Sequence, residues 1–355
     1  MKRNMAKAGV LFLSLMFLPV FLTGCGLFGN SSSSAPIDPP QVEPVNSDLV
    51  GGTGEGEKGQ SGEVIMTDKV LYLFDSRGYV VPMTMKIPYS EAIAKQVLTY
   101  MVKGGPVEKN LPPGFSAVLP VGTTFQLNVK TEDGTAVVDF SKEFKNYEAN
   151  EEEKILQAVT WALTEFPTIK QVKIRIEGKD VETMPVAGTP VNQPLTREDG
   201  INIEVADSAM PGNSTALTLY FEGETPDGSL QYFVPVTRLV PWTEDKTAAT
   251  VAELIKGPLP GSGLVSNILP TTKVNQVKVD QGVALADFDE KILGVSEGGK
   301  EASIKGIQSV LLSLAATSGA EKVQILVNGK ADPLKNLIDF SQPVAKPKSI
   351  NPLQF

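Results

Sequence analysis

The sequence predicts an α+β fold, in which two tandem copies of one small mixed-sheet unit carry their helices on one face of the sheet. Short motifs between residues 71 and 202 return in the same order between residues 219 and 351, at offsets of 148 to 153 residues. In each copy, strand-like apolar alternation is interleaved with two stretches of helical periodicity. The matching segments are Leu71-Tyr72 and Leu219-Tyr220, Val80-Val81-Pro82 and Phe233-Val234-Pro235, Gly105-Pro106 and Gly257-Pro258, Leu119-Pro120 and Leu269-Pro270, Val138-Asp139-Phe140 and Ala286-Asp287-Phe288, Val172 to Lys179 and Val323 to Lys330, and Gly200-Ile201-Asn202 and Ser349-Ile350-Asn351.

Each copy predicts the element order β-β-α-β-β-α-β. In the first copy we expect strands at 70–74 and 78–87 around a Ser-Arg-Gly turn, at 125–129 and 136–140 around an Asp-Gly turn, and at 172–176. The last strand of the second copy is expected at 323–327. The last five elements of each copy form an α-β-β-α-β core.

Helix signals lie between these strands. In the first copy, Ser90 is the expected N-cap of a helix with Ile93, Val97 and Met101 on its apolar stripe, and Gly104-Gly105-Pro106 is expected to end it. A second helix has apolar residues between 155 and 166 and stops at Pro167. The second copy predicts helices near 247–256 and 300–318. Since each helix has one apolar stripe, both should pack on the same face of the sheet.

The N-terminus has the features of a lipoprotein signal peptide. Lys2, Arg3 and Lys7 precede 17 uncharged, mostly apolar residues, which is normal for a signal-peptide core and marginal for a membrane span. The segment ends in Leu22-Thr23-Gly24-Cys25, which resembles the bacterial lipobox. This resemblance implies cleavage between Gly24 and Cys25 and lipid attachment to the Cys25 sulfur, where two acyl chains would anchor the protein stably. The alternative is a spanning helix that ends near a buried cysteine.

The next segment predicts a disordered tether. A serine run, four prolines and a glycine-rich stretch occupy residues 26–62 with almost no apolar periodicity. The chain then divides into a leader at 1–24, the lipidated cysteine and tether at 25–62, a first domain with its exit segment at 63–204, and a second at 205–355.

Composition excludes several function classes. The 355 residues contain no histidine and one cysteine, so Ser-His-Asp triads, Cys-His dyads, histidine zinc sites and internal disulfides are excluded. There are 32 basic and 41 acidic side chains, which disfavours nucleic acid as a partner. We expect no cofactor and no metal site.

Two short patterns overlap in one glycine-rich loop. Gly294 to Lys300 has the spacing of a P-loop, but Glu301 follows where a magnesium-binding Ser or Thr belongs. The same loop places Ser296 in a G-x-S-x-G pattern, but no histidine is present to act as its base. A glycine-rich helix entry is the favoured interpretation.

The remaining polar candidates favour structural roles. Asp139 and Asp287 occupy the same position in both copies, and a turn or helix-start carboxylate is favoured over general acid/base work. The run Glu151-Glu152-Glu153 is interpreted as a solvated helix start rather than a metal site.

Three aromatic residues are interface or core candidates. Trp161 lies beside the apolar stripe of the second helix and is expected in the core. Trp242 and Tyr232 suit either an interface or the core, and the sequence does not separate these roles.

Both copies resemble the GerM domain. The resemblance rests on Lys-Gly-Gly-Pro (103–106), Leu-Pro-Val-Gly-Thr-Thr (119–124), Val-Val-Asp-Phe-Ser-Lys-Glu-Phe (137–144), Thr-Glu-Phe-Pro (164–167) and the endings at 172–179 and 323–330. The second copy departs at 294–300, which is glycine-rich where the first copy has acidic residues. The family implies an endospore-forming bacterium and a core similar to the ring-building motif of secretion-system proteins.

This resemblance implies a membrane-anchored lipoprotein of sporulation and spore germination that is not an enzyme. It would sit on the outer face of the cytoplasmic membrane, in the space between mother cell and forespore. Its partners would be other sporulation envelope proteins, with assembly into an oligomer or ring as one form of contact. The alternatives are a surface lipoprotein that binds a small ligand or cell-wall fragment, and a hydrolase that uses serine, lysine or carboxylates.

Overall fold

The computed structural model describes residues 64–294, 299–334 and 336–353. The predicted leader, the predicted cleavage site after Gly24, the predicted lipid attachment at Cys25 and the predicted tether to residue 62 lie outside the described residues, and so does Ser296. No helix within the described ranges combines the length and apolarity needed to cross a bilayer.

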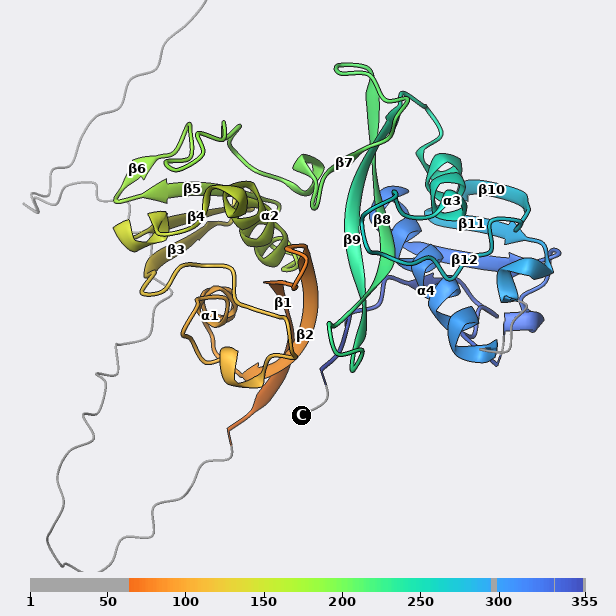
Figure 1. The fold of residues 1–355 in the computed structure, drawn as a ribbon, viewed down its shortest axis with the longest axis horizontal. Helices are drawn as coiled ribbons and strands as arrows, with labels where there is room; N and C mark the ends of the chain where they lie inside the picture. Colours follow the sequence, from red (N-terminus) through yellow and green to blue (C-terminus); the bar gives the residue numbers. More distant parts are fainter. Residues whose placement is uncertain (1–63, 295–298, 335, 354–355) are drawn as a thin grey trace, which may run out of the picture. The chain divides into compact units, whose positions relative to one another are not determined.

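The first repeat folds in the predicted order, with one short strand that the sequence did not indicate (Figure 1). That strand is β6, which has two residues and follows a turn at Glu177 and Gly178. The elements are β1 (Met66–Phe74), β2 (Val80–Pro88), α1 (Ile93–Tyr100), β3 (Phe125–Lys130), β4 (Thr135–Phe140), α2 (Glu152–Leu163), β5 (Gln171–Ile176) and β6 (Lys179–Asp180).

The second repeat follows the same order after a short strand, β7, in the connection between the repeats. The predicted domain boundary between residues 204 and 205 falls inside this strand. The elements are β7 (Glu204–Val205), β8 (Ser214–Glu224), β9 (Gln231–Pro241), α3 (Lys246–Lys256), β10 (Val274–Asp280), β11 (Val283–Phe288), α4 (Gly299–Thr317), β12 (Lys322–Val327) and β13 (Val344–Ala345).

Each repeat contains the predicted α-β-β-α-β core, built on a four-stranded mixed sheet. In the first sheet β3 and β4 are antiparallel, β4 and β5 are parallel, and β6 closes the edge. The second sheet has the same order, β10-β11-β12-β13, with the same directions. Because the two core sheets share their strand order and strand directions, the structure confirms the α+β class and the two tandem units.

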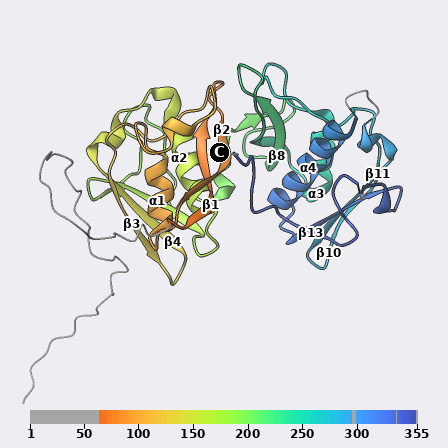
Figure 2. The same cartoon turned by 90° about the horizontal axis from the view of Figure 1, so that it is seen from below.

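The first two strands of each repeat form a hairpin separate from the core sheet. In the first repeat α2 contacts β1, β2 and β5, and in the second α4 contacts β8 and β12. The helices therefore lie between the hairpin and the core sheet of their own repeat, as Figure 2 shows. The inward positions of β4 and β5, the two central strands of the first core sheet, are apolar and buried. These are Ala136, Val138, Phe140, Val172, Ile174 and Ile176.

The start of the first helix corrects one prediction. Ser90 does not cap α1, because the helix begins at Ile93 after Ala92, which makes no side-chain cap. The Ser90 hydroxyl instead accepts the backbone N–H of Ala92 at 3.2 Å, so it closes the turn that leads into the helix. In the second repeat Asp245 is a true N-cap of α3, since its Oδ1 accepts the Ala248 N–H at 2.8 Å.

Candidate functional site

The duplicated aspartates hold a turn, as the sequence predicted. Asp139 Oδ1 accepts the backbone N–H of Gly178 at 2.9 Å, and Asp287 Oδ1 accepts that of Gly329 at the same distance. Each carboxylate ties the end of one parallel strand to the turn that follows its neighbour. Among the described residues, neither aspartate belongs to a group of three or more side chains that could bind a metal ion.

The acidic run at the start of α2 is not solvated throughout, which corrects the prediction for Glu152. This side chain is fully buried, and its carboxylate accepts the backbone N–H groups of Val186, Ala187 and Thr189, each at 2.8 Å. The Tyr147 hydroxyl donates to it as well, at 2.9 Å. Glu152 therefore fixes the exit loop of the first repeat onto α2.

The environment of Glu152 stabilises its charged form. Burial alone raises the pKa of a carboxyl group, but the hydrogen bonds from Thr189, Ala187 and Val186 outweigh burial and lower the pKa of Glu152 to about 2. The loop is held best while this carboxylate is ionised.

The three aromatic candidates have different roles. Trp161 is buried, as expected, and its Nε1 donates to the Gly200 carbonyl at 3.0 Å. Tyr232 is 2% exposed and reaches the other repeat, since its hydroxyl donates to Asp75 Oδ2 at 2.9 Å. Trp242 is 59% exposed at the end of β9. Tyr232 is thus an interface residue within the chain, and Trp242 belongs to neither the core nor this interface.

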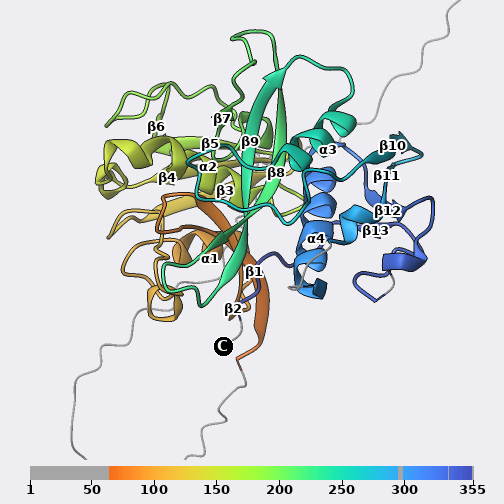
Figure 3. The ribbon, with the colours of Figure 1, turned by 45° about the vertical axis from the view of Figure 1, so that its right-hand side comes forward.

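The two repeats meet along their hairpins, where β2 contacts β9 (Figure 3). Two asparagines hold this seam. Asn202 accepts the Val80 N–H at 2.8 Å and donates to the carbonyls of Val80 at 2.8 Å and Pro235 at 2.7 Å. One amide group thereby binds the second hairpin strand of both repeats.

Asn351 makes the corresponding set of bonds with the repeats exchanged. It accepts the Phe233 N–H at 2.8 Å and donates to the carbonyls of Phe233 and Pro82, both at 2.8 Å. Because Phe233 and Pro235 match Val80 and Pro82 in the duplication, the two asparagine clamps are equivalent. Both asparagines have positive φ, 47° and 50°, which asparagine tolerates better than most residues.

The exit segments, which contain Ile201-Asn202 and Ile350-Asn351, also bond to the opposite repeat next to each asparagine. The Ile201 N–H donates to Thr237 Oγ1 at 2.9 Å, and the Thr237 N–H donates back to the Ile201 carbonyl at 2.8 Å. Ile350 and Thr84 repeat this exchange at 2.9 Å and 3.0 Å. Each exit segment is therefore bound by the hairpin of the other copy.

At the seam, the carboxylate of Glu165 lies close to two cationic side chains. Glu165 Oε1 lies 2.6 Å from Arg197 Nη2 and 3.7 Å from Lys346 Nζ, and it accepts the Tyr72 hydroxyl at 2.7 Å. Arg197 and Lys346 occupy matching positions in the two exit segments. Burial raises the pKa of a carboxyl group, but the positive charges of Arg197 and Lys346 outweigh burial and hold the pKa of Glu165 below its usual value.

The duplication is asymmetric at this carboxylate. The offset that aligns Val172 with Val323 places Ala316 where the first repeat has Glu165. Tyr220, the counterpart of Tyr72, is buried, and its hydroxyl has no hydrogen-bond partner among the described residues. The first repeat therefore supplies the carboxylate that faces the cations of both exit segments.

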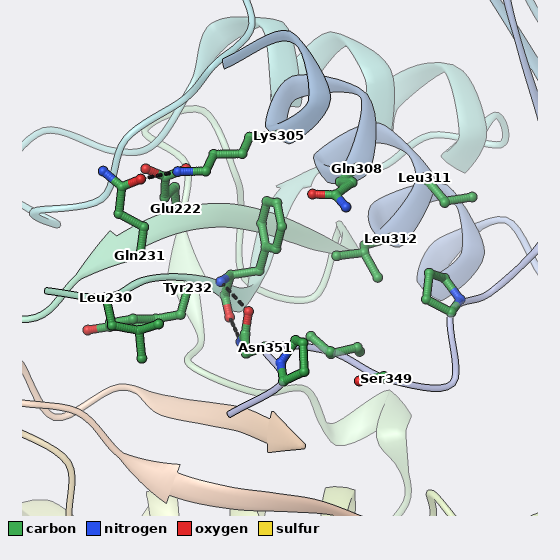
Figure 4. A pocket seen from close by; sticks show the side chains of 14 residues that line it. Glu222, Leu230, Gln231, Tyr232, Lys305, Gln308, Leu311, Leu312, Ser349 and Asn351 are labelled. Atoms are coloured by element: carbon green, nitrogen blue, oxygen red, sulfur yellow. Dashed lines mark hydrogen bonds and ion pairs between the residues drawn. The ribbon is translucent and has the colours of Figure 1, made fainter. Parts of the chain in front are cut away.

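A pocket of about 240 Å³ opens in the second repeat beside the Asn351 clamp (Figure 4). Its walls come from α4, from the start of β9 and from the second exit segment. Lys305 lies at one end, 3.2 Å from Glu222, and Gln308, Leu311 and Leu312 line the α4 side. The sequence reasoning did not indicate this pocket, although Gln308 matches Gln157 in the duplication.

The asparagine clamps predict a large stability effect. Asn202→Ala would leave the buried N–H and carbonyl of Val80 and the carbonyl of Pro235 without this partner. We expect a loss of about 3 kcal/mol in the free energy of unfolding, measured by urea denaturation. Asn328→Ala is the control, because Asn328 also has positive φ but is exposed, and it should cost about 1 kcal/mol. Equal losses in the two variants would contradict the clamp.

Glu152 predicts an acid-dependent loss of stability. Because its pKa is lowered on folding, its contribution is complete above pH 4.5 and disappears as the pH falls towards 2. Glu152→Gln should therefore lower the free energy of unfolding at pH 7 and flatten its pH dependence between pH 4.5 and pH 2, relative to the wild type. The exposed Glu132→Gln should leave both unchanged. A wild-type pH slope in Glu152→Gln would refute the assignment.

The fold and sequence resemble known proteins over nearly the whole chain. The Germane family, described as sporulation and spore germination, matches residues 70–182 and 218–332. The spore germination protein GerM of Bacillus subtilis (strain 168) is 38% identical over 369 residues, covering 99% of each chain. The solved structure of the tandem GerMN domains of the sporulation protein GerM from Bacillus subtilis has a TM-score of 0.73 and 39% identity, covering 82% of this chain and 100% of that one. The chain therefore belongs to the Germane family of sporulation and spore germination proteins.

Proposed function

We propose that this chain is a non-enzymatic, lipid-anchored protein that assembles with other proteins in the envelope between mother cell and forespore. The match to a spore germination protein over 99% of both chains carries the proposal. Two tandem units of the same fold in a solved sporulation protein support it. On this basis the chain acts in both sporulation and germination, through contacts between proteins.

The uses of the polar side chains support a role without catalysis. Asp139 and Asp287 hold turns, Glu152 holds a loop and Glu165 neutralises two cations of the seam. Since the sequence has no histidine, the usual general base is missing as well. The candidates for acid/base chemistry are thus engaged in structural contacts.

The N-terminal sequence supports the membrane anchor. The lipobox-like Leu22-Thr23-Gly24-Cys25 places the only cysteine of the sequence where the lipid is attached in bacterial lipoproteins. The tether that follows would let the folded repeats work away from the outer face of the cytoplasmic membrane.

A ligand-binding lipoprotein is the second candidate, and the pocket beside Asn351 favours it. A small ligand or a cell-wall fragment bound there would stabilise the folded state. A rise in melting temperature that depends on ligand concentration would support this candidate over a pure assembly role.

The anchor is tested by Cys25→Ala. We expect this variant to lose labelling by radioactive fatty acid and to leave the membrane fraction or accumulate as an uncleaved precursor, because the acceptor sulfur is missing. Thr23→Ser is the control, since it keeps a small residue before the cleavage site and should be labelled as the wild type is. Continued labelling of Cys25→Ala would overturn the anchor.

The assembly role is tested in sporulating cells of an endospore former that carries this chain. We expect in vivo crosslinking to trap forespore-envelope proteins on the wild-type chain, and deletion of the chain to reduce the yield of spores. The Asn202→Ala variant, in which the seam is weakened, should trap less. Normal sporulation of the deletion strain, with no envelope protein trapped, would overturn the role.

A further inference from the structure

The two copies of the duplicated unit differ at one glutamine of the second helix. In the first repeat, Gln157 Oε1 accepts the backbone N–H of Asn202 at 2.8 Å, and its Nε2 donates to Glu153 at 3.2 Å. Gln308 occupies the same position in α4, at the offset that aligns the last strands. No hydrogen bond joins Gln308 to Asn351 in the part of the chain that the structure describes. The amide of Gln308 instead lines the pocket of the second repeat (Figure 4).

The first repeat shows what this glutamine recognises. Its partner there is the backbone N–H of a segment that crosses the helix. A primary amide can accept one N–H and donate to one carbonyl, which are the two groups that a peptide backbone offers. The open position at Gln308 therefore suits a peptide amide supplied from outside the second repeat.

The rest of the pocket combines apolar side chains, uncharged polar side chains and one ion pair. Leu311, Leu312 and Phe233 contribute apolar surface next to Gln308. The single cation, Lys305, is 3.2 Å from Glu222, and Asn267 also donates to this carboxylate at 3.0 Å. Because the charges are paired, the pocket does not select a strongly charged ligand.

The size of the pocket limits what it can take. Its volume of about 240 Å³ is below the roughly 300 to 1,000 Å³ typical of sites for drug-sized ligands. It suits one apolar side chain with the amides on either side of it, which is how an anchor residue of a partner fills a pocket at an interface.

We propose that this pocket binds an extended peptide segment of a partner protein, with one apolar side chain against Leu311 and Leu312 and a backbone amide on Gln308. The inference rests on the proposed assembly function and deepens it, because it names the surface and the chemistry of recognition. The partner segment is uncharged at the anchor and carries a branched aliphatic side chain.

The test uses blocked amino acids as probes and NMR of the isotope-labelled protein as the readout. N-acetyl-leucine N-methylamide should shift the side-chain amide signals of Gln308 and the methyl signals of Leu311 and Leu312, saturating with a dissociation constant on the order of 1 mM. N-acetyl-glycine N-methylamide offers the same amides without the side chain. It should bind about tenfold more weakly, because no apolar surface is buried.

Variants separate the two parts of the site. Gln308→Met keeps the length of the side chain and removes its amide, so the leucine probe should bind about fivefold more weakly. Ser349→Trp should fill the pocket from its rim and abolish the shifts. Lys348→Trp is the matched control at the next exposed position, which does not line the pocket, and Gln126→Met is the control on an exposed strand. Both controls should bind the leucine probe as the wild type does.

The failure of this proposal is distinct from failure of the assembly role. Equal binding of the leucine and glycine probes, or wild-type binding by both Gln308→Met and Ser349→Trp, would overturn the peptide site. If crosslinking in sporulating cells then trapped the same envelope proteins on wild type and Ser349→Trp, the assembly role would stand without this pocket. If the wild type trapped none, the assembly role would fail whatever the probes did.

Discussion

The joining of the two repeats depends on Asn202 and Asn351, the two asparagine clamps at the seam. Where two hairpins pack together, their buried backbone N–H and carbonyl groups need hydrogen-bond partners, because each unpaired group lowers the free energy of unfolding. Asn202 and Asn351 each satisfy three such groups, two on one repeat and one on the other. Since each asparagine sits in an exit segment that also bonds to the opposite hairpin, the ends of both repeats are fixed by the same contacts. Each repeat therefore supplies the hairpin strand that binds the exit segment of the other repeat.

This arrangement has consequences for assembly. In each repeat the helices are covered by the repeat's own hairpin, and the hairpins in turn contact each other through β2 and β9. The apolar helix faces are thus occupied inside the chain. Under the proposed assembly role, contacts with other proteins would use other surfaces, such as the edges of the core sheets at β3 and β10, the exposed Trp242 and the pocket at Gln308. Gln157 bonds to the exit segment of its own repeat, whereas Gln308 lines a pocket, so the two copies keep the same fold while this one side chain differs in its surroundings.

The sequence predicted the candidate residues unevenly. The roles of Asp139, Asp287 and Trp161 followed from duplication and periodicity, because their contacts are made within one repeat. Glu152 was misjudged as solvated, since nothing in an acidic helix start indicates that an exit loop more than thirty residues later returns to cover it. Tyr232 could not be assigned, because its partner Asp75 lies in the other copy. The exit asparagines were visible as a repeated Ile-Asn pair, but spacing alone carries no information on what such a pair binds.

The order of strands and helices, the duplication and the α-β-β-α-β core were determined by the sequence itself. Each depends on local periodicity and turn chemistry, which act between residues close in the chain. The separation of each hairpin from its core sheet, the crossing of the exit segments, the shared carboxylate Glu165 and the pocket at Gln308 were decided only by the tertiary structure. These features depend on contacts between residues far apart in the chain, whose geometry is set by packing and by the pairing of buried polar groups rather than by any local pattern.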